Sequence, residues 1–131
     1  MSKILLLALG GALGAIARYS VSGIVFKHMH VFGVFPFGTL VVNVSGALII
    51  GILWGAWMHG DISSNIGTFL FIGLLGSFTT FSTFSIETLN LFRMNEIKIG
   101  ILNILANNIL SLVMVYVGFI ISRAFINVCL K

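Results

Sequence analysis

The sequence predicts an all-α integral membrane protein in which four transmembrane helices form a single domain, residues 1–131. Of its 131 residues, 59% are hydrophobic and only 8% are charged, whereas a soluble globular domain carries about 25% charged residues. Four nearly uncharged stretches each reach the roughly 20 residues that a helix needs to cross the hydrocarbon core. These stretches nearly exhaust the chain, so the pattern predicts neither a linker nor a second domain.

The first span is predicted over about residues 3–27. The apolar run after Lys3 resembles the start of a secretory signal, but it continues to Phe26, which favours an uncleaved span. Arg18 is the only full charge well inside a span, and such a guanidinium needs acceptors, anions or a route to the interface. A link between helices and a contact with an ion both fit Arg18.

The second span, predicted over about residues 37–58, has a polar face. Thr39, Asn43 and Gly46 are spaced by four and three residues, so they share one side of a helix. Asparagine amides can donate hydrogen bonds to an anion that has lost its water, and they can equally bridge two helices. Both roles stay open for Asn43. Small residues that allow close helix packing in lipid recur in the first two spans, namely Gly10, Gly14, Gly51 and Gly55.

The third span, predicted over about residues 66–92, is the most unusual. Its core from Gly73 to Phe84 mixes glycines and hydroxyl residues so densely that it predicts a broken helix. Carbonyls freed by a break are tolerated at membrane depth only inside protein or along a cavity, where they can coordinate a small cation. Phe81 and Phe84 point to one side, and their positive ring edges can stabilise a small anion. Packing against lipid or core is the more common role of such a pair.

The fourth span, predicted over about residues 97–121, carries a polar stripe in its first half. Asn103, Asn107 and Ser111 recur at every fourth residue, so their side chains follow one side of the helix. Amides and hydroxyls can donate to an anion or can bridge neighbouring helices. Both interpretations remain open for this stripe.

The charges that flank the spans give almost no preference for one orientation. Three basic residues fall on each side of a four-span chain: Lys3, Arg123 and Lys131 on one, and Lys27, Arg93 and Lys98 on the other. Lys and Arg in short loops set membrane orientation, so such a chain can insert both ways and pair as an antiparallel dual-topology homodimer. An orientation set by another feature is the alternative. The scattered basic residues fit membrane-edge anchors better than a nucleic-acid site.

The chain resembles the Fluc (CrcB) family of fluoride channels along essentially its whole length. The most specific match is the run from Gly73 to Phe84, centred on TTFSTF at residues 79–84. Supporting matches are GGALGA at residues 10–15 followed by Arg18, and GTLVVN at residues 38–43 followed by Gly46. The resemblance implies an antiparallel homodimer with two pores. Its activity would be passive, selective export of fluoride across the cell (inner) membrane, which relieves fluoride toxicity.

The resemblance also implies roles for individual residues. The pore would be formed by Phe81, Phe84, Asn43, Ser82, Thr83, Asn107 and Ser111, with Arg18 near a vestibule. Backbone carbonyls of Gly76 and Thr79 would bind a structural sodium ion shared at the dimer interface. Asn103 and Asn107 are amides where the family has tyrosine or serine types. Asn108 has no implied role, and Glu87, one turn beyond Phe84, is a candidate vestibule residue.

Two other functions fit parts of the sequence. A small multidrug-type proton-coupled transporter needs a carboxylate within the membrane, and Glu87, late in the third span, is the one acidic residue inside a predicted span. A non-transporting membrane scaffold would be compatible with the glycine surfaces alone. An enzyme is disfavoured because the sequence shows neither a nucleophile paired with a base nor a metal-ligand triad.

Overall fold

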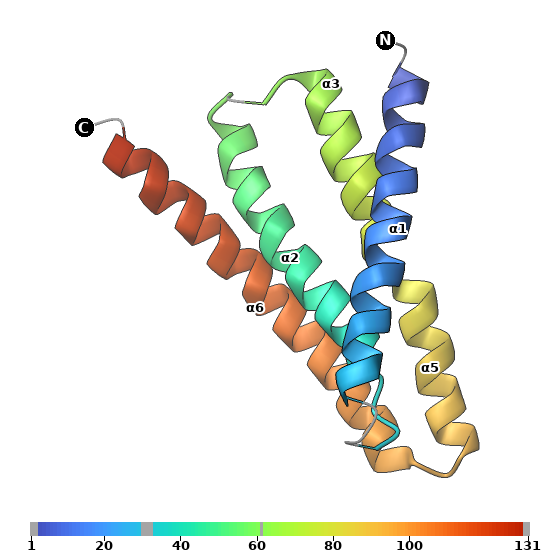
Figure 1. The fold of residues 1–131 in the computed structure, drawn as a ribbon. Helices are drawn as coiled ribbons and strands as arrows, with labels where there is room; N and C mark the ends of the chain where they lie inside the picture. The colour runs from blue at the N-terminus through green and yellow to red at the C-terminus, as the bar shows by residue number, and fades with distance from the viewer. Residues whose placement is uncertain (1–2, 30–32, 61, 130–131) are drawn as a thin grey trace.

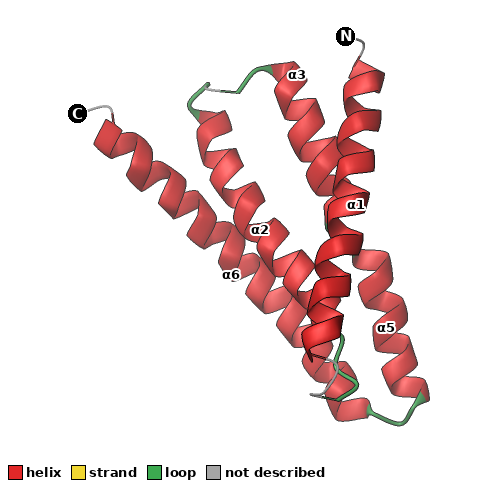
Figure 2. Ribbon diagram, viewed as in Figure 1, coloured by secondary structure: helices red, strands yellow, loops and turns green. Residues whose placement is uncertain are grey.

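The computed structural model describes residues 3–29, 33–60 and 62–129, and within them the chain consists of helices joined by short loops (Figures 1 and 2). Four helical segments are long and apolar enough to cross a membrane, which confirms the predicted all-α membrane fold. The elements are α1 (Lys3–Met29), α2 (Phe37–Met58), α3 (Ser64–Gly67), the π-helix η2 (Thr68–Leu75), α4 (Gly76–Phe78), α5 (Phe81–Arg93) and α6 (Ile97–Cys129). The third span comprises α3, η2, α4 and α5. The chain is therefore a multi-pass membrane protein.

The four spans pack as two pairs. Helix α2 lies along α6, and α1 lies against η2 and α4 of the third span. The two ends of the described chain lie at the same end of the molecule, opposite the connections from α1 to α2 and from α5 to α6 (Figure 1). Lys3 and Arg123 are thus at one end, and Lys27, Arg93 and Lys98 are at the other. Lys131, which the sequence assigns to the first end, lies outside the described residues.

Glycines bring the paired helices into backbone contact. A Cβ added at Gly10 would lie 2.6 Å from the carbonyl oxygen of Phe69, and one at Gly14 would overlap the carbonyl of Leu74. In the other pair, a Cβ at Gly51 would overlap the carbonyl of Val115 on α6. Helix association in lipid depends on such close approach. The predicted small-residue surfaces of the first two spans are therefore packing surfaces.

The third span is interrupted inside its glycine- and hydroxyl-rich run. After the wide turns of η2 and one turn of α4, the backbone is extended at Thr79 (φ −77°, ψ 154°) and Thr80 (φ −149°, ψ 122°). The helix resumes at Phe81, where the hydroxyl of Thr80 caps the new N-terminus by accepting a bond from the Thr83 amide. The π-helix before the break was not predicted from the sequence, and π-turns are frequent at functional sites.

Three of the helical spans are longer than the stretches predicted from the sequence. The first runs over Lys3–Met29, against a prediction of 3–27, and the third runs over Ser64–Arg93, against a prediction of 66–92. Helix α6 continues to Cys129, against a predicted end at residue 121. Polar residues such as Arg123 mark the edge of the hydrocarbon core. They do not end the helix, because the following residues keep its backbone hydrogen bonding. The core is centred on Val42, Leu75 and Phe78, where α2 meets the third span just before its break.

Candidate functional site

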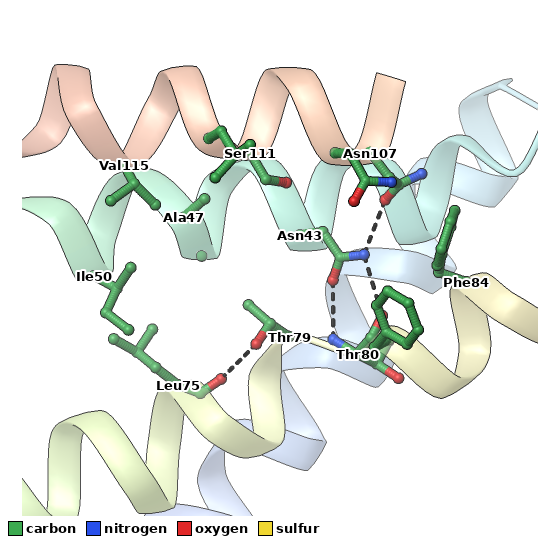
Figure 3. A pocket seen from close by; sticks show the side chains of 14 residues that line it. Asn43, Ala47, Ile50, Leu75, Thr79, Thr80, Phe84, Asn107, Ser111 and Val115 are labelled. Carbon is green, nitrogen blue, oxygen red and sulfur yellow. Dashed lines mark hydrogen bonds between the residues drawn. The ribbon is translucent and has the colours of Figure 1, made fainter. Parts of the chain in front are cut away.

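A cavity of about 370 Å³ opens between the break in the third span and the paired helices α2 and α6. Figure 3 shows polar groups from all three elements gathered at one end and aliphatic groups at the other. The polar end includes Asn43, Thr80 and Asn107, and Phe84 lies beside them. The lining comprises Asn43, Gly46, Ala47, Ile50, Leu75, Thr79, Thr80, Phe81, Phe84, Asn107, Asn108, Ser111, Leu112 and Val115. The cavity therefore brings together part of the polar faces predicted on the second and fourth spans with the interrupted segment of the third, while Thr39 and Asn103 lie outside its lining.

The break redirects two backbone amides. In a continuous α-helix each amide donates to the carbonyl four residues earlier. The Thr80 amide instead donates to Asn43 Oδ1 at 2.9 Å, and the Thr83 amide donates to Thr80 Oγ1 at 3.2 Å. The carbonyls of Gly76 and Thr79 thus lack the amides that a continuous helix would supply. These are the two carbonyls that the family resemblance implies for sodium, and a partially unwound membrane helix can offer such oxygens to a small cation.

Phe81 and Phe84 form a pair beside the break. Their ring centroids are 5.3 Å apart and the ring planes are inclined by 59°, so the rings are neither stacked nor coplanar. Both line the cavity, but Phe84 is only 6% exposed whereas Phe81 is 73% exposed. One ring is therefore fixed by packing within the chain. The other is presented at the surface of the molecule.

The amides of Asn43 and Asn107 line the cavity, but their donors are engaged. Asn43 Nδ2 donates to the Thr80 carbonyl at 3.2 Å and to Asn107 Oδ1 at 2.9 Å. Asn107 Nδ2 donates to the backbone and side-chain oxygens of Asn103, at 3.2 and 2.8 Å. A primary amide has two N–H donors, so both residues use their full donor capacity inside the chain. Of the two roles that the sequence allowed for these amides, bridging between spans is the one seen here.

Ser111, one turn beyond Asn107 on α6, differs from these amides because its side chain has no hydrogen-bond partner among the described residues. Its hydroxyl oxygen is buried, and the residue lines the cavity. A serine within a helix commonly donates to the carbonyl four residues earlier, as Ser85 does to Phe81 at 2.8 Å. A buried polar group without a partner is uncommon. Ser111 is thus the uncommitted donor of the site.

Ser82, Thr83 and Arg18 lie outside the cavity lining, whereas Asn108 is part of it. Ser82 and Thr83 bond to the Thr80 hydroxyl at the start of α5, with oxygen–oxygen distances of 3.3 and 3.1 Å. Arg18 is half-buried on α1, and its side chain forms no hydrogen bond or ion pair with another of the described residues. Asn108 is in the lining, but its amide donates to the Ile104 carbonyl of its own helix at 2.7 Å.

Glu87 lies at a second cavity, of about 560 Å³, bounded by the C-terminal half of α1 and the start of α2. Thr39 Oγ1 donates to Glu87 Oε1 at 2.8 Å, and Glu87 Oε2 is buried without a partner among the described residues. The cavity also includes Tyr19, Ser20, Ser22 and Lys27. The sequence alone leaves the role of Glu87 open. Its hydrogen bond with Thr39 could not be predicted from local spacing, because 48 residues separate the two.

Comparisons with known proteins agree with the resemblance seen in the sequence. The family model described as CrcB-like protein, Camphor Resistance (CrcB), matches residues 5–119. A fluoride-specific ion channel FluC of Parabacteroides distasonis is 44% identical over 123 residues, which cover 94% of each chain. Proteins of the same name from Shewanella putrefaciens and Pyrococcus abyssi are 46% and 43% identical, covering 90% and 91% of this chain and 94% of each relative.

Proposed function

The chain belongs to the CrcB family, and from this premise we propose that it is a subunit of a fluoride-specific ion channel. It would let fluoride leave the cell passively across the cell (inner) membrane and so relieve fluoride toxicity. Such conduction needs no covalent chemistry, so the proposed role is not enzymatic. The relatives at 43–46% identity over most of the chain are the main support for the substrate.

The cavity beside the break is the proposed fluoride path, and Ser111 is the observation that carries this assignment. A small anion gives up its water only where several donors replace it together, while a channel must also release it. The cavity lining contains no cationic residue. A hydroxyl donor without a partner and the two rings of Phe81 and Phe84 offer moderate attraction instead. Asn43 and Asn107 would form the polar wall, with Ser82 and Thr83 behind it, and Arg18 would attract anions at a vestibule.

A second copy of the chain would complete the path. Polar groups at membrane depth are costly when they face lipid, yet the cavity opens at the surface and Phe81 is 73% exposed. In the sequence, three basic residues flank the four spans on each side, which allows insertion in both orientations. We therefore propose an antiparallel dual-topology homodimer, whose two equivalent cavities would form two pores.

A structural sodium ion is the proposed cofactor of this dimer. The fit rests on the break, which diverts the amides of Thr80 and Thr83 to side-chain oxygens and so frees the carbonyls of Gly76 and Thr79 from helical pairing. Carbonyl oxygens suit small, hard cations. Two carbonyls from each copy would meet at the dimer interface and supply the charge stabilisation for the ion.

Fluoride efflux from liposomes tests the proposal directly. Purified protein is reconstituted, and fluoride release is followed with an ion-selective electrode, with chloride release as the control. Replacing Phe81 or Phe84 with isoleucine should sharply reduce fluoride efflux because the positive ring edges are lost. Phe125→Ile is the matched control, since Phe125 is 71% exposed on α6 and lies outside the cavity lining. Absent fluoride efflux, or equal chloride efflux, would refute the proposal, and proton-coupled drug exchange would support the multidrug alternative.

A further inference from the structure

A chain of hydrogen bonds leaves the third span at Thr80 and crosses two other spans. The Thr80 amide donates to Asn43 Oδ1 on α2 at 2.9 Å. Asn43 Nδ2 in turn donates to Asn107 Oδ1 on α6, also at 2.9 Å. Figure 3 shows both links at the polar end of the cavity. The side-chain amides of Asn43 and Asn107 are therefore hydrogen-bonded, directly or through one another, to the backbone at the break.

The series of hydrogen bonds continues away from the cavity and returns to the third span. Asn107 Nδ2 donates to Asn103 Oδ1 at 2.8 Å, and Asn103 Nδ2 donates to Thr88 Oγ1 at 2.9 Å. The Thr88 hydroxyl then donates to the Phe84 carbonyl at 2.8 Å. Asn103 is 0% exposed and Thr88 is 6% exposed, and neither lines the cavity. These two residues are therefore not part of the cavity wall.

The direction of every bond in this chain is determined by its two ends. The backbone amide of Thr80 can only donate, and the backbone carbonyl of Phe84 can only accept. Each intervening side chain accepts from one neighbour and donates to the next. Reversing any one amide would place two donors or two acceptors face to face. The two backbone ends enclose Phe81 and Phe84, so the chain of bonds fixes the segment that carries both rings.

Resting on the proposed function, we infer that Asn103 and Thr88 are positioning residues for the fluoride path. Thr88 holds the amide of Asn103 in one orientation, and this orientation passes through Asn107 to Asn43. Asn43 in turn holds the extended backbone at Thr80. Loss of the Thr88 hydroxyl would free these amides to turn, so that the break and the two rings lose their fixed geometry. The residues would act without touching the anion.

Thr88→Val, which removes the hydroxyl and keeps the shape, tests this inference with two measurements. The first is hydrogen–deuterium exchange of the Thr80 amide, which we expect to become roughly fivefold faster when its bond to Asn43 is weakened. The second is fluoride efflux, which should fall by a similar factor or more. Thr88→Ser should restore both. Thr68→Val is the matched control, because the Thr68 hydroxyl also donates to a carbonyl four residues earlier, that of Ser64 at 3.0 Å, and Thr68 lies outside the cavity lining.

The outcomes separate this inference from the proposed function. Missing fluoride efflux in the unmodified protein would refute the proposed function, while Thr80 exchange would still show whether the bonds act together. Unchanged Thr80 exchange in Thr88→Val would overturn the inference. If Thr88→Val does not assemble, Asn103→Leu takes its place, since it cuts the same chain and leaves the Thr88 bond to Phe84 intact. Unchanged exchange in Asn103→Leu would likewise overturn it.

Discussion

Replacing Ser111 with alanine should change stability and conduction in opposite directions. The Ser111 hydroxyl oxygen is buried without a partner among the described residues. A buried polar group that makes no hydrogen bond costs about 1–3 kcal/mol. Removing this hydroxyl takes away that cost, so Ser111→Ala should stabilise the folded protein by about 1 kcal/mol or more. Most substitutions in a packed region do the reverse, which makes the sign informative.

The effect on fluoride follows from the same hydroxyl acting as a donor. A hydrogen bond to a charged group contributes about 1.5–3 kcal/mol, and about 1.4 kcal/mol corresponds to a tenfold change in an equilibrium constant. Losing the bond should therefore reduce fluoride occupancy of the cavity by about tenfold or more. At fluoride concentrations well below saturation, efflux should decrease by the same factor. At saturating concentrations the difference should narrow.

The assay pairs initial fluoride efflux from liposomes with thermal unfolding in detergent. Ser45→Ala is the matched control, because the Ser45 hydroxyl already donates to the Val42 carbonyl of its own helix at 3.2 Å and the residue lies outside the cavity lining. We expect the control to keep normal efflux without a gain in stability. A destabilised Ser111→Ala protein, or one with normal efflux at low fluoride, would refute the reasoning.

Three further predictions concern packing, the buried carboxylate and sodium. Gly51→Ala should destabilise the protein by about 1–3 kcal/mol, because the new Cβ overlaps the Val115 carbonyl. Gly23→Ala is the control and should not destabilise the protein, since nothing lies within 4 Å of a Cβ added at Gly23. Equal unfolding temperatures for the two variants would contradict this prediction. Thr39→Val should lower the unfolding temperature more than Thr39→Ser, because it leaves Glu87 without its hydrogen bond; identical unfolding temperatures would count against this prediction. The unfolding temperature should be higher in a sodium buffer than in one where N-methylglucamine replaces sodium, as expected for a ligand that binds only the folded state. An unfolding temperature that does not depend on sodium would argue against the proposed ion.

Much of the fold was predictable because it follows from hydropathy and local spacing. Four apolar stretches of spanning length predicted the four helices, and the glycines predicted the surfaces of contact between them. The dense glycine and hydroxyl run marked the region where the third span is interrupted at Thr79 and Thr80. The polar stripe of Asn103, Asn107 and Ser111 was visible from its four-residue spacing.

The site was less predictable because its residues come from different spans. The contact of Asn43 with Thr80 depends on the relative depth of α2 and the third span, which close packing at glycines determines. The pairing of Thr88 with Asn103 depends on how α5 and α6 lie against each other on either side of the short turn that joins them. Within one chain the structure does not bring Arg18 to the cavity, so the implied role of this residue depends on the proposed partner subunit.

By itself the sequence determined the membrane location, the four spans, the position of the unusual third span and the family. Those properties follow from composition and local pattern, and they need no knowledge of how the spans lie against one another. Only the tertiary structure decided that the amides of Asn43 and Asn107 are fully engaged while the hydroxyl of Ser111 is not. A hydrogen bond requires donor and acceptor within about 3.5 Å. Between residues tens of positions apart, helix packing alone determines that distance.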